Sequence, residues 1–286
     1  MAAPATNAPL SKTELAQLIA ADIEPGSFVN LGIGQPTSVS NYLRPEQDVT
    51  LHTENGMLGM GPEAHGDEVD EDLINAGKIP VTELPGTSYF HHGDSFGMMR
   101  GGHLDVCVMG AFQVSTGGDL ANWSTGAPDA IPAVGGAMDL AIGARQTWVM
   151  MTLFAKDGSC KIVPELTFPP TGLACVSRVY TVDGVFLIEN GRTTIREAFG
   201  TTPEELRERM GVDVDLPDHH PQLRLPRLHL GQQERCETAP HALLFRPHPL
   251  SEVGSFPLVP GGSVRRARHD GARRVRATRS VTCRVW

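Results

Sequence analysis

The stretch that decides the fold is Val-Thr-Leu-His-Thr-Glu-Asn-Gly-Met-Leu-Gly-Met-Gly-Pro, residues 49–62. Its first five residues are rich in β-branched and apolar side chains, which predicts a short buried strand. Glu54 stands at the carboxyl end of that strand, and Asn55-Gly56, a strong turn dipeptide, follows it at once. Open α/β sheets carry their reactive groups at the carboxyl ends of their strands, so Glu54 is the first candidate for chemistry.

Three kinds of chemistry are open to Glu54: general base, metal ligand and nucleophile. His52 lies on the same strand face as Glu54, but no cysteine and no second carboxylate lies near Glu54 in the sequence. This spacing of possible ligands disfavours a metal site. A nucleophilic carboxylate needs partial desolvation and N–H donors that can receive an oxyanion. The glycines at positions 56, 59 and 61 can bring such backbone donors close. The alternative is that Glu54 has no chemical role and is only a buried or half-exposed acidic residue in a glycine-rich turn.

Length and composition indicate the broad class. The 286 residues, 40% hydrophobic and 20% charged, describe a globular protein of one large or two smaller domains. The net charge of -9 disfavours nucleic acid as a partner. The five cysteines form no C-x-x-C pair, which fits a reducing cytosol. The chain opens without a signal peptide and has no apolar run of the ~18 residues a membrane helix needs, so we expect a cytoplasmic protein and no membrane.

The charge is divided unevenly along the chain. Residues 221–286 contain 12 Arg, no Lys and four acids, a balance of +8, which leaves the rest at -17. We expect residues 1–9 to be disordered, residues 10–215 to form the folded domain, and residues 216–286 to be an irregular or disordered basic extension outside it. A shifted reading frame in a GC-rich gene and a genuine basic arm both explain the extension, and its motif-free composition favours the first.

Strands and helices alternate along the rest of the chain. Capping boxes predict helices over residues 12–23 and 203–210, and a strand over 28–31 runs into a glycine-rich turn with Pro36 at the next helix start. Further strands are expected at 81–84, 104–109, 148–153, 173–180 and 185–188. Further helices are expected at 98–102 and after Gly136, and the acidic stretch 63–72 is expected to contain a helix start. This alternation predicts an α/β fold with an open, mostly parallel sheet and helices on both faces.

Two glycine-rich turns, at Gly32 and Gly34 and at Gly135 and Gly136, can both reach the sheet edge that carries Glu54. That gathering of a carboxylate and backbone donors suits acyl transfer. Glu54 also lies 20 residues after Gly34, which is the place of a ribose-binding acid in a Rossmann unit. Against NAD, Thr37 replaces the third glycine of the fingerprint and Pro36 interrupts it.

The segment Tyr89-Phe-His-His-Gly-Asp contains two adjacent histidines, His91 and His92. Neighbours in sequence point in different directions and make a poor metal pair. We expect them to take part in packing or in substrate contact, with packing favoured.

Six segments carry a resemblance to a known family. They are Asn30-Leu-Gly-Ile-Gly-Gln-Pro-Thr, Thr53-Glu-Asn-Gly-Met-Leu-Gly-Met-Gly-Pro, Asp72-Leu-Ile-Asn-Ala-Gly-Lys, Met99-Arg-Gly-Gly-His-Leu-Asp, Gly118-Asp-Leu-Ala-Asn-Trp and Gly135-Gly-Ala-Met-Asp-Leu. Over residues 10–213 the chain strongly resembles the B subunit of family I 3-oxoacid CoA-transferases, and Glu-Asn-Gly is specific to that family. Tyr89-Phe-His-His-Gly-Asp-Ser-Phe and Ala133-Val-Gly-Gly-Ala-Met-Asp look most like the 3-oxoadipate enzymes of aromatic catabolism. An acetoacetate-type acceptor is the alternative.

The resemblance implies that Glu54 attacks the thioester of succinyl-CoA and passes through an acyl-glutamyl anhydride and an enzyme-CoA thioester to a 3-oxoacid acceptor. The implied substrate- and CoA-binding residues are Gly32, Gly34, Asn55, Gly56, Gly135, Gly136 and Ala137. No metal or redox cofactor is implied, because CoA is a substrate. A separate A subunit is expected to be needed for activity.

Two functions outside this family stay open. A dehydrogenase would bind NAD and form no covalent adduct. A sensing module for CoA or a sugar phosphate would keep its ligand binding after Glu54→Ala.

Overall fold

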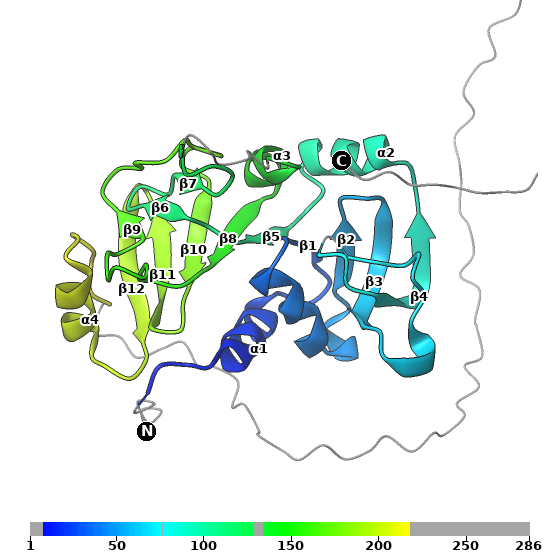
Figure 1. The fold of residues 1–286 in the computed structure, drawn as a ribbon, viewed down its shortest axis with the longest axis horizontal. Helices are drawn as coiled ribbons and strands as arrows, with labels where there is room; N and C mark the ends of the chain where they lie inside the picture. The colour runs from blue at the N-terminus through cyan, green and yellow to red at the C-terminus, as the bar shows by residue number, and fades with distance from the viewer. Residues whose placement is uncertain (1–7, 76, 128–133, 218–286) are drawn as a thin grey trace, which may run out of the picture. The chain divides into compact units, whose positions relative to one another are not determined.

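A nine-stranded mixed sheet forms the centre of this computed structural model, which describes residues 8–75, 77–127 and 134–217 (Figure 1). In chain order its strands are β1 (Phe28–Leu31), β2 (Thr50–Thr53), β3 (Met57–Glu63), β4 (Val81–Tyr89), β5 (Val106–Met109), β8 (Gln146–Met150), β10 (Val176–Tyr180), β11 (Gly184–Glu189) and β12 (Arg192–Ala198). Across the sheet the order is β12-β11-β10-β8-β5-β1-β2-β3-β4. The strands from β10 to β2 pair in parallel, and antiparallel strands extend the sheet at each end.

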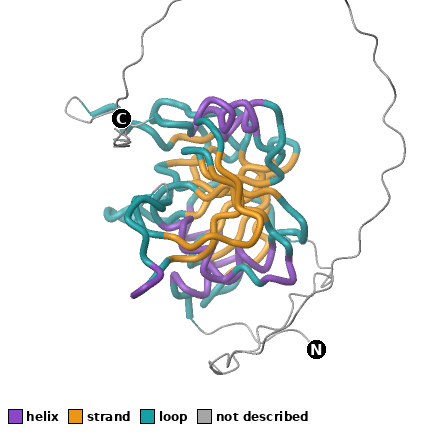
Figure 2. The backbone as a smooth tube through the Cα atoms, turned by 90° about the vertical axis from the view of Figure 1, so that its right-hand side faces the viewer, coloured by secondary structure: helices purple, strands orange, loops and turns teal. Residues whose placement is uncertain are grey.

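Helices lie on both sides of these strands (Figure 2). The α-helices are α1 (Lys12–Asp22), α2 (His92–Arg100), α3 (Ala137–Gly143) and α4 (Pro203–Met210), and the 3₁₀ helices are η1 (Gln35–Tyr42), η2 (Pro45–Gln47) and η3 (Gly66–Glu68). A second, three-stranded sheet has the order β7-β6-β9, made of β6 (Gln113–Ser115), β7 (Leu120–Ala121) and β9 (Ile162–Val163). Among the described residues, no helix has the length and apolar content needed to cross a membrane.

The central strand β5 shows why the sheet needs cover on both faces. All four of its residues are buried, and successive side chains point to opposite faces of a sheet. Val106 and Val108 belong to a core that includes α1, whereas Cys107 and Met109 belong to a second core that includes α2 and α3. A parallel strand covered in this way is typical of α/β proteins, and the α/β class is confirmed.

Two helices begin where their capping boxes predict. The Ser11 Oγ accepts from the backbone N–H of Glu14 at 3.2 Å, and the Glu14 carboxylate accepts from the backbone N–H of Ser11 at 2.8 Å. Thr202 and Glu205 repeat this pair of hydrogen bonds at the start of α4. Both boxes satisfy backbone donors that an uncapped helix start leaves free.

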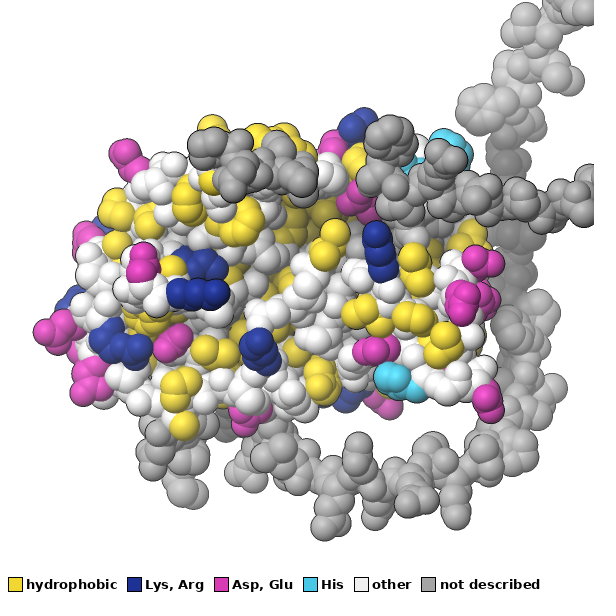
Figure 3. Space-filling model, viewed as in Figure 1, with side chains coloured by type: hydrophobic (Ala, Val, Ile, Leu, Met, Phe, Trp, Pro, Cys, Tyr) yellow, Lys and Arg dark blue, Asp and Glu magenta, His cyan; other side chains and the backbone are white. Residues whose placement is uncertain are grey.

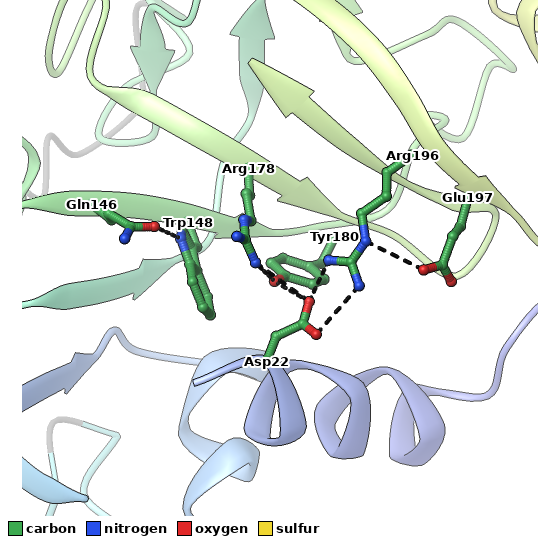
Figure 4. A network of polar contacts seen from close by, with 7 residues as sticks. All are labelled: Asp22, Gln146, Trp148, Arg178, Tyr180, Arg196 and Glu197. Atoms are coloured by element: carbon green, nitrogen blue, oxygen red, sulfur yellow. Dashed lines mark hydrogen bonds and ion pairs between the residues drawn. The ribbon is translucent and has the colours of Figure 1, made fainter. Parts of the chain in front are cut away.

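A half-buried ionic network holds the end of α1 against the antiparallel side of the sheet (Figure 4). The Asp22 carboxylate accepts from the Tyr180 hydroxyl at 2.8 Å and pairs with the Arg196 guanidinium. Arg178 reaches the same carboxylate at 3.5 Å and stacks over the Trp148 ring at 4.8 Å. The side chains of Asp22 and Arg196 are each 11% exposed, and Arg196 also pairs with Glu197 at 3.3 Å, so the charges of this network compensate one another.

Several segments differ from the sequence-based expectations. Residues 57–63 form β3, which turns back antiparallel to β2, and residues 192–198 form β12, and neither strand was expected. The expected helix start in the acidic stretch 63–72 is wrong, because the structure has only the short η3 there. The helix after Gly34 is a 3₁₀ helix.

The expected domain boundary at residue 215 stays a prediction. Of the segments expected to be disordered, 1–9 and 216–286, all but residues 8–9 and 216–217 lie outside the described residues. On the face drawn in Figure 3, basic side chains lie among acidic and hydrophobic ones.

Candidate active site

Glu54 follows β2 at the carboxyl edge of the parallel strands and is half-buried. The chain turns back at once, because the Gly56 N–H donates to the Thr53 carbonyl at 3.1 Å and the Met57 N–H donates to the Thr53 hydroxyl at 3.0 Å. The predicted turn after the predicted strand is therefore confirmed. It presents Glu54 at its tip beside Asn55.

Gly56 is required at this turn for two reasons. Its φ is +112°, a conformation that residues with a side chain rarely adopt, and a Cβ at this position would collide with the Phe90 carbonyl oxygen. The Gly56 carbonyl in turn accepts from the Phe90 N–H at 3.0 Å. The Glu54 turn is thus fixed to the segment that leads into α2.

The second glycine-rich turn comes into contact with the Glu54 carboxylate. The Gly136 N–H donates to Glu54 Oε2 at 3.2 Å, across 82 residues of sequence. A Cβ on Gly136 would lie 2.5 Å from that oxygen, and one on Gly135 would lie 4.0 Å from Oε1. Ala137 begins α3 directly after this contact. The structure therefore brings Glu54 and Gly136 together, as the sequence led us to expect.

The first glycine-rich turn shares the sheet edge with Glu54. Gly32 follows β1, the parallel neighbour of β2, and its N–H donates to the Val108 carbonyl at 2.8 Å. Gly34 has a φ of +93° and precedes η1. Asn55 is exposed and makes a long contact of 3.5 Å from its side-chain amide to the Ile74 carbonyl. Binding roles for these three residues stay predictions.

A buried hydrogen-bond network lies next to the Glu54 turn and was not expected from the sequence. His52 Nδ1 is 3.1 Å from Asn30 Nδ2, and His52 Nε2 is 3.0 Å from Ser95 Oγ. Ser95 also donates to the Thr53 carbonyl at 3.0 Å. Burial lowers the pKa of the His52 imidazole to about 4, so the ring is neutral at neutral pH.

One face of α2 forms a wall beside Gly136. The Phe96 ring comes within 3.3 Å of the place where a Gly136 Cβ would stand. His92 packs against Phe96 at 4.8 Å between ring centroids, and Arg100 lies 5.5 Å from the Phe96 centroid while pairing with Asp139 at 2.6 Å. Spacing of four residues places 92, 96 and 100 on one helix face.

The two adjacent histidines point in different directions, as expected. His91 Nδ1 accepts from the Gly93 N–H at 3.0 Å and so caps α2, whereas His92 packs on Phe96. The predicted packing role is confirmed for His92, and substrate contact stays a prediction. Within residues 8–75, 77–127 and 134–217, no three metal-ligating side chains come together.

This arrangement has the parts of an acyl-transfer site. A half-buried carboxylate stands at a strand end, and a backbone N–H without a neighbouring Cβ meets one of its oxygens. When such a carboxyl carbon becomes tetrahedral during a reaction, the same N–H can stabilise the charge on that oxygen.

Comparison with known proteins identifies relatives that align with most of the length of the described region. The chain is 65% identical over 172 residues to the B subunit of the 3-oxoadipate CoA-transferase of Pseudomonas putida, covering 60% of this chain and 80% of that protein. It is 54% identical over 206 residues to the protein of the same name in Acinetobacter baylyi, covering 72% and 95%. It is 44% identical over 193 residues to the B subunit of a probable succinyl-CoA:3-ketoacid coenzyme A transferase of Bacillus subtilis, covering 67% and 89%.

Solved structures share the fold at low sequence identity. The acyl-CoA transferase apoenzyme of Escherichia coli O157:H7 superposes with a TM-score of 0.57 at 18% identity, covering 73% of this chain and 42% of that one. The glutaconate coenzyme A-transferase of Acidaminococcus fermentans gives a TM-score of 0.54 at 17% identity, covering 76% and 90%. The Coenzyme A transferase family model matches residues 12–201. The resemblance carried by the six sequence segments is thus confirmed, and the chain belongs to the coenzyme A transferase family.

Proposed function

We propose that this chain is the B subunit of a CoA-transferase that moves CoA from succinyl-CoA to 3-oxoadipate, with Glu54 as the nucleophile. The observation that carries the proposal is the Glu54 carboxylate at the end of β2 with the Gly136 N–H at 3.2 Å from its oxygen. The acceptor is proposed from the two bacterial relatives named for 3-oxoadipate, at 65% and 54% identity.

The first half of the proposed cycle loads CoA onto the enzyme. A Glu54 oxygen attacks the thioester carbonyl of succinyl-CoA, the C–S bond breaks, and CoA leaves as a thiolate from a succinyl-glutamyl anhydride. The thiolate then attacks the glutamyl carbonyl of the anhydride and releases succinate. Glu54 now carries CoA as a thioester, and one difficult exchange has been divided into two easier ones.

The second half reverses these steps with the acceptor. The acceptor carboxylate attacks the Glu54 thioester, and CoA thiolate leaves from a mixed anhydride. Attack of the thiolate on the acceptor carbonyl frees the Glu54 carboxylate and gives the 3-oxoacyl-CoA product. Each step exchanges a carboxylate with a thiolate, so neither an electron carrier nor a metal is part of the proposed cycle.

Within this cycle, the Gly136 amide stabilises the oxygen that gains charge when the Glu54 carboxyl carbon is tetrahedral. A carboxylate is a weak nucleophile. Binding energy from the remote parts of CoA must therefore lower the barrier at Glu54. We propose that a separate A subunit supplies part of this binding surface, since the relatives are named as B subunits.

An acetoacetate-type acceptor is the second candidate, favoured by the 44% identity to a relative named for succinyl-CoA:3-ketoacid transfer. The two candidates differ in the second carboxylate of 3-oxoadipate. Comparing kcat/KM for 3-oxoadipate and acetoacetate on the same complex decides between them.

The proposal is tested by trapping the intermediate in the complex with the A subunit. After incubation with succinyl-CoA and treatment with borohydride or hydroxylamine, mass spectrometry maps the modified peptide. We expect modification at Glu54, its loss when 3-oxoadipate is added before trapping, and none in Glu54→Gln. An unmodified Glu54 in a complex that still transfers CoA would contradict the covalent mechanism.

A further inference from the structure

His52 lies two residues before Glu54 on β2 and is almost completely enclosed, with 2% of its surface exposed. Both ring nitrogens nevertheless have partners, Asn30 on β1 and Ser95 on α2. A buried imidazole therefore joins three elements at the strand end that carries the nucleophile.

The direction of each hydrogen bond in this network follows from the neighbouring atoms. Asn30 Nδ2 lies 3.1 Å from His52 Nδ1 and 3.1 Å from the His52 carbonyl oxygen, and a carbonyl oxygen can only accept. The Asn30 amide nitrogen therefore donates to both, which makes Nδ1 an acceptor and leaves the ring proton on Nε2. His52 Nε2 then donates to Ser95 Oγ, and the Ser95 hydroxyl donates to the Thr53 carbonyl.

The network ends at the peptide bond that precedes Glu54. The Thr53 carbonyl belongs to this peptide and accepts both from Ser95 at 3.0 Å and from the Gly56 N–H at 3.1 Å. Rotation of the peptide would break both hydrogen bonds and would also turn the Glu54 side chain. The carboxylate's approach to the Gly136 amide thus depends on this one peptide orientation.

We infer that His52 is a positioning residue for Glu54, acting through Ser95 on the peptide that directs the nucleophile toward the Gly136 amide. The inference rests on the proposed function, in which Glu54 attacks the thioester. The ring acts in its neutral, Nε2-protonated form and exchanges no proton with the reacting atoms. Displacement of a reacting group by about 1 Å can cost about 100-fold in rate.

The test compares four variants of the complex with the A subunit: His52→Leu, His52→Gln, Ser95→Ala and Gln47→Leu. Gln47 is the matched control, because it is also a buried polar residue, and its amide donates to the carbonyls of Ala20 and Ile23. It precedes β2 and therefore lies at the other end of that strand from Glu54. For each variant, kcat, KM for succinyl-CoA, the single-turnover rate of Glu54 adduct formation and the melting temperature are measured.

We expect His52→Leu and Ser95→Ala to lower kcat and the adduct rate by about 10- to 100-fold, with KM close to that of the wild type. His52→Gln should restore most of the rate, since an amide can accept at one end and donate at the other. Gln47→Leu should lower the melting temperature and keep kcat.

The inference is overturned if His52→Leu keeps the kcat of the wild type, or if Gln47→Leu loses as much kcat as His52→Leu. Should His52→Leu fail to fold, Ser95→Ala decides by the same criterion. A wild-type complex without a Glu54 adduct would instead disprove the proposed function, and this inference with it, before any variant is compared.

Discussion

The amide of Gly136 determines how closely the backbone approaches the Glu54 carboxylate. In Gly136→Ala the new Cβ would stand 2.5 Å from Glu54 Oε2 and 2.8 Å from its Cδ, so the carboxylate must move away. We expect kcat to fall by about 100-fold, the size of effect seen when one oxyanion donor is lost. Gly97→Ala is the control, because a Cβ there meets no atom within 4 Å. Steady-state kinetics in which both variants keep full activity would contradict the role of Gly136.

Because His52 is neutral in the folded protein, we expect the stability of the protein to fall as the pH is lowered. Its folded-state pKa of about 4 lies below the usual value of about 6.5, so between these values only the unfolded chain binds the proton. The contribution of neutral His52 to the free energy of unfolding is fully present above pH 6.5. It is lost as the pH falls toward 4, by at most about 1.4 kcal/mol per pH unit. Urea unfolding at pH 7.5 and pH 5 should show a smaller loss for His52→Gln than for the wild type. Equal losses in both proteins would mean that His52 does not titrate in this way.

At the scale of single residues, local sequence predicts Glu54 and its turn but not the network beside it. Glu-Asn-Gly after a β-branched run is a local signal, and the structure confirms the strand and the turn. The pairing of His52 with Asn30 and Ser95 joins residues 22 and 43 positions apart. Only the register of β1 on β2 and the docking of α2 create that pairing, so no local pattern could indicate it.

At the scale of elements, Asp22 should be the residue whose loss most weakens the attachment of α1. Asp22→Ala removes the shorter of the two ion pairs of the Arg196 guanidinium and leaves it with Glu197 alone, at 3.3 Å, so the cost should approach but not exceed the roughly 3–5 kcal/mol of an uncompensated buried charge. Arg145→Ala removes an ion pair whose arginine is 68% exposed and should cost about 0–1 kcal/mol. Urea unfolding measures both values. The double variant Asp22→Ala with Arg196→Met should recover part of the loss, and no recovery would show that the loss does not come from the uncompensated charge.

The same scale shows which elements a sequence can predict. Helices α1 and α4 carry capping boxes within four residues of chain, and both begin where those boxes predict. Strand β3 contains Gly59, Gly61 and Pro62, residue types that are depleted in strands, and it exists because β2 and β4 pair with it. Strand β12 likewise depends on pairing with β11. Both of these strands were missed because their formation depends on pairing with other strands, which local sequence does not show.

At the scale of the whole molecule, the candidate site forms because neighbouring strands of the sheet run in parallel. Because β1 and β2 run in the same direction, the turns after them meet at one edge, and the Gly136 turn reaches the same edge from 82 residues away. The rule for open α/β sheets predicts that these turns gather there. It does not predict which backbone N–H contacts which oxygen, since that depends on how α2 and α3 pack together.

We expect the enzyme to need only the first 216 residues of this chain. The family model ends at residue 201, and the alignment that covers 95% of the Acinetobacter baylyi relative covers only 72% of this chain. The last tertiary contacts of the described region include the pairing of Asp215 with Arg192 and the burial of Val214. A chain that ends after Leu216 keeps all of these contacts. We therefore expect it to assemble with the A subunit and to keep the kcat of the full chain, as measured by size-exclusion chromatography and steady-state assay.

A chain that ends after Gly211 is the matched control for this truncation. It loses the buried Val214 and the ion pair of Asp215, so it should unfold at a lower temperature than the chain ending at Leu216. This contrast separates damage to the fold from loss of the extension. Failure of the Leu216 chain to bind the A subunit, with an unchanged melting temperature, would show that the basic extension is a working part of the interface. Because the extension carries a balance of +8 over residues 221–286, its binding would then weaken as salt is raised.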